Sequence, residues 1–192
     1  MDKQEDLDLL EQLVGNLLTL LHYNWEEDTN LKDTPKRVAK LWLKELSPKG
    51  LDEPKITVFP EKHSQMVIVA GHTVWTRCPH HLERIKMRVS IGYIQGDSHL
   101  VIGASKLPRV ADFFAQGMVL QESYTDKVVS FLYDKLQAKG VGVHVVGKHH
   151  CMHARGVETD GVMVTTALKG IFQEDGVKNE FLREVHFKPW NL

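Results

Sequence analysis

The chain has 192 residues, and its 24 Lys plus Arg against 25 Asp plus Glu give a formal net charge of −1. This length predicts one domain with a small extension, which needs neither a disulfide nor a metal to fold. The near-neutral balance argues against a general nucleic-acid binder, and no apolar run is long enough to predict a membrane span. Two cysteines and an acidic N-terminus without a signal-peptide pattern favour a reducing, cytoplasmic location.

Residues 1–52 form a front section that is predicted to be helical. Leucines 9, 10, 13, 17, 20 and 21 recur at helical spacing and make one apolar stripe. A second helix is expected to begin near Thr34, which can cap it, with Pro35 in the first turn. Residues 47–50 are expected to end this helix.

Residues 53–192 show a different pattern, in which strands and helices alternate in pairs. The expected order is strands at 66–70 and 85–93, helices at 105–116 and 121–139, strands at 141–145 and 162–168, and a last helical piece at 178–184. Residues 99–102 either continue the second strand or add a short one. This order predicts an α+β fold in which an antiparallel sheet carries two helices on one face.

Both cysteines lie beside histidines in two short clusters. The clusters are Cys78-Pro79-His80-His81 and His149-His150-Cys151-Met152-His153. A tight turn could direct Cys78 and His81 at one ion. His149 and Cys151 would share a face if their segment is a strand. Thiolate with imidazole favours zinc, and three protein ligands leave a position for water, as in catalytic sites. Buried thiols with scattered surface histidines, or a redox pair, are the alternatives.

Cationic side chains recur three residues apart on two of the predicted helices, where such residues are neighbours. The pairs are Arg37 with Lys40 and Lys106 with Arg109, and Arg155 follows Cys151 by four residues. The second pair lies at a helix N-terminus, which favours an anion. A polyphosphate site and solvated surface charge both fit this pattern.

Taken together, these segments resemble the GTP cyclohydrolase I family over about residues 30 to 188. The matching motifs stand in the family's order at 33–40, 78–81, 92–94, 101–109, 113–116, 121–122, 149–157 and 180–182. The resemblance implies the tunnelling fold, ββααββ, which agrees with the order derived above. It also implies that residues 53–192 are a tunnelling-fold catalytic domain behind the helical section.

The resemblance assigns roles to individual residues. It implies that Cys78, His81 and Cys151 are zinc ligands and that His80 and His149 transfer protons, with Ser105 near the ribose. Glu122 would recognise the guanine edge, beside Gln121 as a second substrate-binding residue. The implied triphosphate clamp is Arg37, Lys40, Lys106, Arg109 and Arg155.

The implied activity is zinc-assisted hydrolysis of GTP to 7,8-dihydroneopterin triphosphate and formate, the first step of tetrahydrofolate, pterin or deazapurine biosynthesis. Family members form rings, usually two stacked pentamers with active sites between subunits, so a homodecamer is expected here. Neither a nucleic-acid nor a membrane partner is expected.

The sequence departs from the family pattern at a few positions. Pro79 replaces the usual Glu beside the ligand Cys, and Glu83 is a candidate to replace that charge. Ser123 replaces the usual Arg after Glu122, and His153 stands where Lys is frequent. These changes keep two alternatives open. One is a zinc enzyme for another purine nucleotide or a pterin, and the other is a non-catalytic purine- or zinc-binding homologue.

Overall fold

The computed structural model describes residues 3–47 and 53–186 of the chain. The chain divides into two compact units, Met1–Lys49 and Gly50–Leu192, and each is described by itself. The expected border between residues 52 and 53, and most of the expected helix stop at 47–50, lie outside the described residues. None of the described helices is both long and apolar enough to cross a membrane.

The N-terminal unit is a pair of helices, α1 (Lys3–Leu20) and α2 (Thr34–Leu46). Val14 of α1 and Ala39 of α2 are buried. Pro35 lies in the first turn of α2, as predicted. The prediction that Thr34 caps this helix is wrong, because Thr34 is already its first residue and Asp33 holds the cap position without a side-chain bond.

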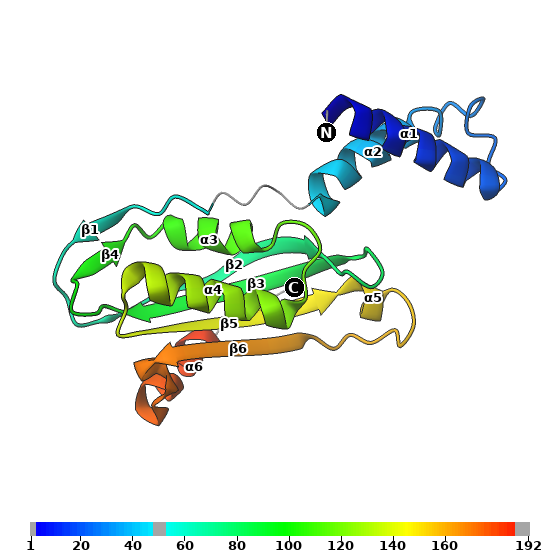
Figure 1. Cartoon of the computed structure of the whole chain (residues 1–192). Helices are drawn as coiled ribbons and strands as arrows, with labels where there is room; N and C mark the ends of the chain where they lie inside the picture. Colours follow the sequence, from blue (N-terminus) through cyan, green and yellow to red (C-terminus); the bar gives the residue numbers. More distant parts are fainter. Residues whose placement is uncertain (1–2, 48–52, 187–192) are drawn as a thin grey trace. The chain divides into compact units, whose positions relative to one another are not determined.

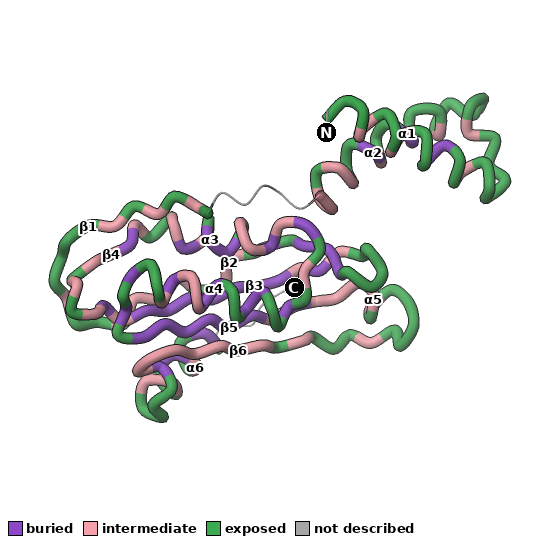
Figure 2. Tube along the Cα trace, in the orientation of Figure 1, coloured by how far each residue is buried: buried purple, intermediate pink, exposed green. Residues whose placement is uncertain are grey.

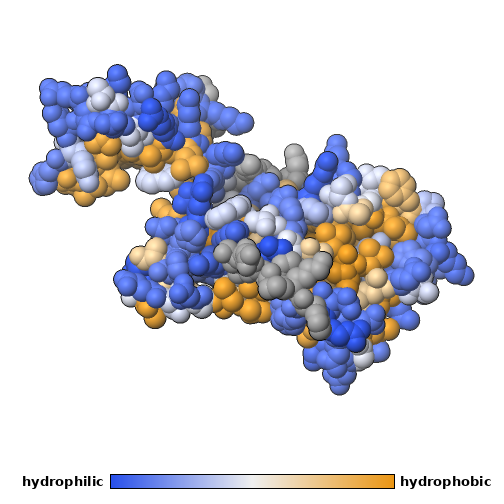
Figure 3. Space-filling model, turned by 180° about the vertical axis from the view of Figure 1, so that it is seen from behind, coloured by the Kyte–Doolittle hydropathy of each residue, from blue (hydrophilic) through white to orange (hydrophobic). Residues whose placement is uncertain are grey.

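The predicted leucine stripe of α1 is present and faces solvent. Leu9, Leu13, Leu17 and Leu20 are 42–74 % exposed, and apolar side chains gather along one side of this unit in Figure 3. The helix pair leaves this stripe uncovered, and on another side of α1 Gly15 lies close against the ring of Trp25.

The C-terminal unit is built on a four-stranded antiparallel sheet in the order β2-β3-β5-β6 (Figure 1). Its strands are β2 (Met66–Arg77), β3 (Arg84–Ile94), β5 (Gly140–His149) and β6 (Met163–Gly170). The helices are α3 (Lys106–Phe114), α4 (Gln121–Leu136), α5 (His150–His153) and α6 (Asp175–His186), with the short η1 (Ile171–Gln173). The predicted ββααββ order is therefore confirmed.

A second, two-stranded sheet pairs β1 (Val58–Pro60) with β4 (Leu100–Ile102). Of the two possibilities left open for residues 99–102, the separate short strand is correct. The sequence pattern missed β1, because three residues are too few to show a period of two.

The main core lies between the sheet and the helices α3 and α4, which cover the same face (Figure 1). Every second residue of β3 points into it, and Ile85, Met87, Val89, Ile91 and Tyr93 are at most 2 % exposed. The two central strands are accordingly the most buried part of the unit (Figure 2). This packing fixes the strand ends from which the candidate site is built.

The opposite face of the sheet is covered at one end by α6 and η1. Phe172 and Phe181 are fully buried there. Gly92 and Gly142 face these rings so closely that a Cβ at either position would overlap them. The two glycines therefore permit close packing of aromatic rings on the sheet, a requirement that a period-two pattern alone does not reveal.

Candidate metal centre

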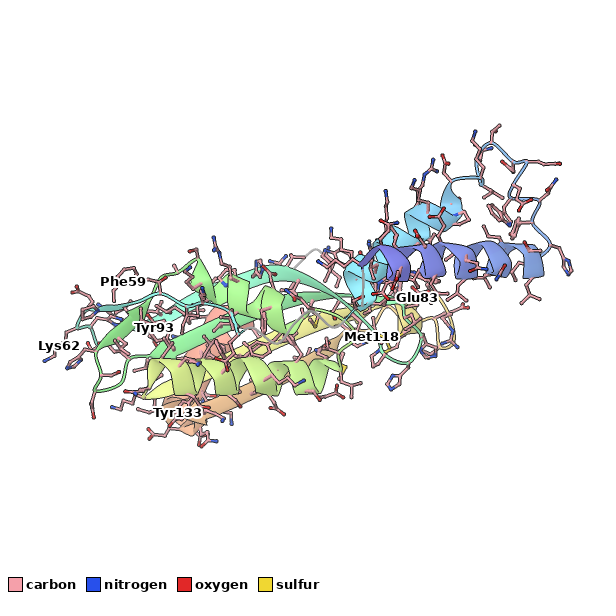
Figure 4. All side chains as sticks on the ribbon, turned by 45° about the horizontal axis from the view of Figure 1, so that its top comes forward. Phe59, Lys62, Glu83, Tyr93, Met118 and Tyr133 are labelled. Carbon is pink, nitrogen blue, oxygen red and sulfur yellow. The ribbon has the colours of Figure 1, made fainter. Side chains whose placement is uncertain are left out.

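The turn between β2 and β3 holds the first candidate cluster. The Cys78 N–H donates to the Glu83 carbonyl at 2.8 Å, and the Leu82 N–H donates to the Cys78 carbonyl at 2.9 Å. Leu82 has a positive φ of 59°, which reverses the chain tightly. Arg77 secures the turn, because its Nη1 donates to the Leu82 carbonyl at 2.8 Å. Figure 4 shows Glu83 and Met118 at the end of the sheet away from Phe59 and Lys62.

The second cluster lies at the same end of the sheet, because antiparallel pairing sets His149 opposite Ile85. β5 ends at His149, and Cys151 lies in the short helix α5. The idea that His149 and Cys151 share a strand face is therefore wrong. The helical turn carries Cys151 back toward the β2–β3 turn instead.

The structure brings Cys78, His81 and Cys151 together. One ligand atom from each lies within 4.8 Å of the other two. Both thiols are free, with Cys78 buried and Cys151 half-buried. Burial, followed by the nearby Cys78 thiol, raises the pKa of Cys151. A bound cation would reverse this effect, because a coordinating thiol loses its proton. Two sulfurs and an imidazole nitrogen therefore fit a metal ion.

The two predicted proton-transfer histidines lie beside this group in different settings. His80 is exposed, with its Nδ1 3.8 Å from Cys78 Sγ. His149 is half-buried, and its Nε2 lies 3.0 Å from Gln121 Oε1. Burial lowers the pKa of His149, and the carboxylate of Glu122 opposes this shift. Glu122 thus lies within electrostatic range of His149, and its side chain is exposed in the first turn of α4.

The predicted phosphate-binding residues are distributed over several elements. Ser105 occupies the N-cap position of α3 without a side-chain capping bond, and Lys106 and Arg109 lie in its first turn. The charge of Arg155, which follows α5, acts on the Cys151 thiol. Arg37 and Lys40 are exposed on α2, in the other unit, where Arg37 pairs with Asp33 at 3.1 Å.

Sequence reasoning missed two supports of the site. One is Arg77, which is nearly buried and holds the metal-site turn. The other is a hydrogen-bonded network beneath His149 that joins Gln121 to Thr125 and Thr165. The spacing of four residues between Gln121 and Thr125 was the available signal, because it places both on one helix face.

The fold and the site together define an α+β protein with a two-layer ββααββ unit and a Cys-His-Cys group that could hold a metal. The family model for GTP cyclohydrolase I matches residues 10–186. The chain belongs to the GTP cyclohydrolase I family, and its ββααββ unit is the tunnelling fold that the resemblance implied.

Curated relatives agree with this assignment over nearly the whole chain. GTP cyclohydrolase 1 of Salmonella choleraesuis is 33 % identical over 98 % of this chain and 86 % of its own length. GTP cyclohydrolase 1 of Citrobacter koseri is 34 % identical over 96 % of this chain and 85 % of its own.

Two solved structures are also similar to part of the chain. An archaeosine synthase QueF-like protein in the apo form has a TM-score of 0.46 at 16 % identity, covering 57 % of this chain and 97 % of that protein. Dihydroneopterin aldolase of E. coli in complex with neopterin has a TM-score of 0.43 at 12 % identity. The match covers 55 % of this chain and 99 % of that protein.

Proposed function

We propose that the protein is a zinc-dependent GTP cyclohydrolase I, which converts GTP and water to 7,8-dihydroneopterin triphosphate and formate. The observation that carries this proposal is the approach of Cys78, His81 and Cys151 to within 4.8 Å in a member of this family. Two thiolates and one imidazole favour zinc over magnesium or calcium, which prefer oxygen ligands. Three protein ligands leave one position open, as in catalytic zinc sites.

Zinc in this group would supply a Lewis acid and activate a water molecule near neutral pH. The chain's own residues perform the remaining tasks. Glu122, exposed at the start of α4, can accept two N–H donors from a guanine edge. His80, whose Nδ1 lies 3.8 Å from Cys78 Sγ, and His149 at the end of β5 can hold and move protons during ring opening and rearrangement, with Ser105 beside the ribose.

The triphosphate clamp is proposed to consist of Lys106, Arg109 and Arg155 with Arg37 and Lys40. A triphosphate carries several negative charges, and each of these cations could form a charge-assisted hydrogen bond with it. The total charge of the chain stays close to neutral because acidic residues elsewhere balance these cations. Gln121 is the other residue for which substrate contact is predicted, and its side chain is buried.

We also propose a homo-oligomer, expected to be a decamer of two pentamers with active sites between subunits. The outer strands of the sheet, β2 and β6, support this. Within the part of the chain that the structure describes, no further strand pairs with β6, and β2 carries only the isolated bridge from Arg77 to Met118 on its outer side. Sheet edges of this kind can pair with another chain. The cytoplasmic location expected from the sequence stays a prediction.

The deciding experiment incubates the zinc-loaded protein with GTP and follows formate release and the fluorescence of the oxidised pterin. We expect both products, and their loss in Cys151→Ser. One zinc per chain with no product from GTP would contradict the proposal and favour another purine or a binding role. GTP consumed only to the ring-opened formamide would point to Pro79.

The oligomeric site has its own test by complementation. Arg37→Ala and Cys151→Ser chains are each expected to be inactive. If subunits share a site, dissociating and reassembling a mixture of the two restores part of the activity. A mixture that stays inactive, with mixed assembly shown by tagged chains, would place each site within one subunit.

A further inference from the structure

Gln121 begins α4 and is the most deeply buried polar residue near the candidate metal centre, with 1 % exposure. Its carboxamide oxygen lies 3.0 Å from His149 Nε2. Its carboxamide nitrogen lies 3.0 Å from the Met163 carbonyl and 3.4 Å from the Val145 carbonyl. The side chain therefore spans the space between α4, the end of β5 and the start of β6.

These contacts fix which end of the carboxamide faces His149. Backbone carbonyls only accept hydrogen bonds, so the end of Gln121 that meets Met163 and Val145 must be the NH₂ group. A flipped amide would set three oxygens against one another without a proton between them. The end that meets His149 is therefore the oxygen, which can only accept. His149 must in turn carry a proton on Nε2.

Two threonines close the network and hold this orientation. The Thr125 hydroxyl donates to the backbone carbonyl of Gln121 at 2.7 Å, which uses its one proton. The Thr165 hydroxyl, 2.7 Å away, must then donate to Thr125 Oγ1. Thr165 Oγ1 is left to accept from Gln121 Nε2 at 3.2 Å. Both hydroxyl protons thus have one direction, and the two protons of the Gln121 amide are divided among three acceptors.

The backbone of β5 also leaves room for this side chain. Gly147 lies directly under the carboxamide, and a Cβ at this position would overlap Gln121 Oε1 and come within 3.4 Å of His149 Nε2. The glycine allows the amide to approach the strand. A buried amide with fixed orientation and a glycine beneath it is the arrangement expected of a group that orients another side chain.

We propose that Gln121 is a positioning residue that acts through His149 rather than by direct contact with the substrate. It holds the His149 ring in place through the 3.0 Å contact between its carboxamide oxygen and the protonated Nε2. The inference rests on the proposed function for the role of His149. It differs from that proposal by moving Gln121 from the substrate-binding set to the support of a proton-transfer residue.

The test replaces Gln121 by Leu, which keeps the volume and removes the acceptor. We expect kcat for formate release to fall about 10- to 100-fold, as for other residues that orient a functional histidine, with KM and zinc content unchanged. Tyr124→Phe is the matched control. It removes a buried bond from the same helix, between the Tyr124 hydroxyl and the Ala111 carbonyl, and should leave kcat unchanged. Thr165→Val, which removes one anchor, should lower kcat less than Gln121→Leu.

The opposite kinetic result would overturn the inference. A raised KM with unchanged kcat in Gln121→Leu would show that the amide binds the substrate, as first predicted. If Gln121→Leu does not fold, Thr165→Val decides alone, and an unchanged kcat in that variant would also overturn it.

A spectroscopic measurement separates this inference from the proposed function. The ¹⁵N chemical shifts of the His149 ring, assigned by comparison with His149→Gln, should show the Nε2–H tautomer in the zinc-loaded protein and a mixture of tautomers in Gln121→Leu. An Nδ1–H tautomer in the unchanged protein would refute the inference. A protein that makes no product from GTP but shows these shifts would refute the proposed function alone.

Discussion

The two sides of the candidate metal centre are built differently. On the β5 side, His149 is half-buried and bonded to a buried amide that the sheet and α4 hold in place. On the β2–β3 side, His80 and His81 are exposed and contact each other edge to face, with ring centroids 6.4 Å apart. The core therefore orients one side before any ligand binds. The other side is shaped by the backbone of a turn, which leaves both of its histidine rings exposed.

The largest expected effect comes from removing a thiol of the candidate metal centre itself. Cys78→Ser should abolish metal binding, lowering zinc from one per chain to near zero and activity by more than about 100-fold, because a hydroxyl is a poor zinc ligand. Metal analysis of the purified protein measures this. His150→Gln is the matched control, because His150 neighbours Cys151 but lies outside the Cys-His-Cys group. Full metal occupancy in Cys78→Ser would refute the ligand assignment.

A substitution beneath His149 should disturb only the β5 side of the candidate metal centre, where the core holds His149 in place. In Gly147→Ala the new methyl group would displace the Gln121 amide, so kcat should fall about tenfold while zinc content stays at one per chain. Gly176→Ala is the control, because nothing lies within 4 Å of a Cβ there. If Gly147→Ala lost zinc as readily as activity, the two sides would not be separable.

The converse change weakens the turn and spares His149. Arg77→Met removes the donor to the Leu82 carbonyl, so the turn that carries Cys78 and His81 should hold a metal less tightly. We expect the zinc affinity to fall about tenfold, measured by competition with a chelator, with the His149 tautomer unchanged. Equal affinity in the variant and the unchanged protein would show that the turn holds its shape without Arg77.

The sequence predicted the part of the site that depends on residue type, and it missed the part that depends on tertiary contact. The Cys and His clusters, together with the order ββααββ, were visible as motifs and as hydrophobic periods. The end of β5 at His149 was not, because a turn of four residues such as α5 leaves no periodic signal. The support of His149 was also hidden, because Gln121 and Thr165 are 44 residues apart and meet only across the helix–sheet packing.

The smallest expected effect is a change of stability with pH, and it concerns His144, another histidine of the strand that ends at His149. His144 points to the other face of β5, where its Nδ1 lies 2.9 Å from Thr166 Oγ1 and its ring packs against His186. Burial, followed by the charge of His186, lowers the pKa of His144 from 6.5 to about 4. Between these values the unfolded chain binds a proton that the folded chain does not, so stability falls as the pH is lowered from 6.5 toward 4.

For this buried group we expect a loss on the order of 1 kcal/mol, or about 2–4 °C in Tm for a chain of this length. Thermal unfolding of metal-free protein between pH 7 and pH 4.5 measures it, with His144→Gln as the reference that cannot titrate. The unchanged protein should lose more Tm than the variant over this range, because all other groups contribute equally to both. Parallel curves would mean that His144 is protonated as easily in the folded chain as in the unfolded one. The contrast between the two faces of β5 would then rest on hydrogen bonding alone.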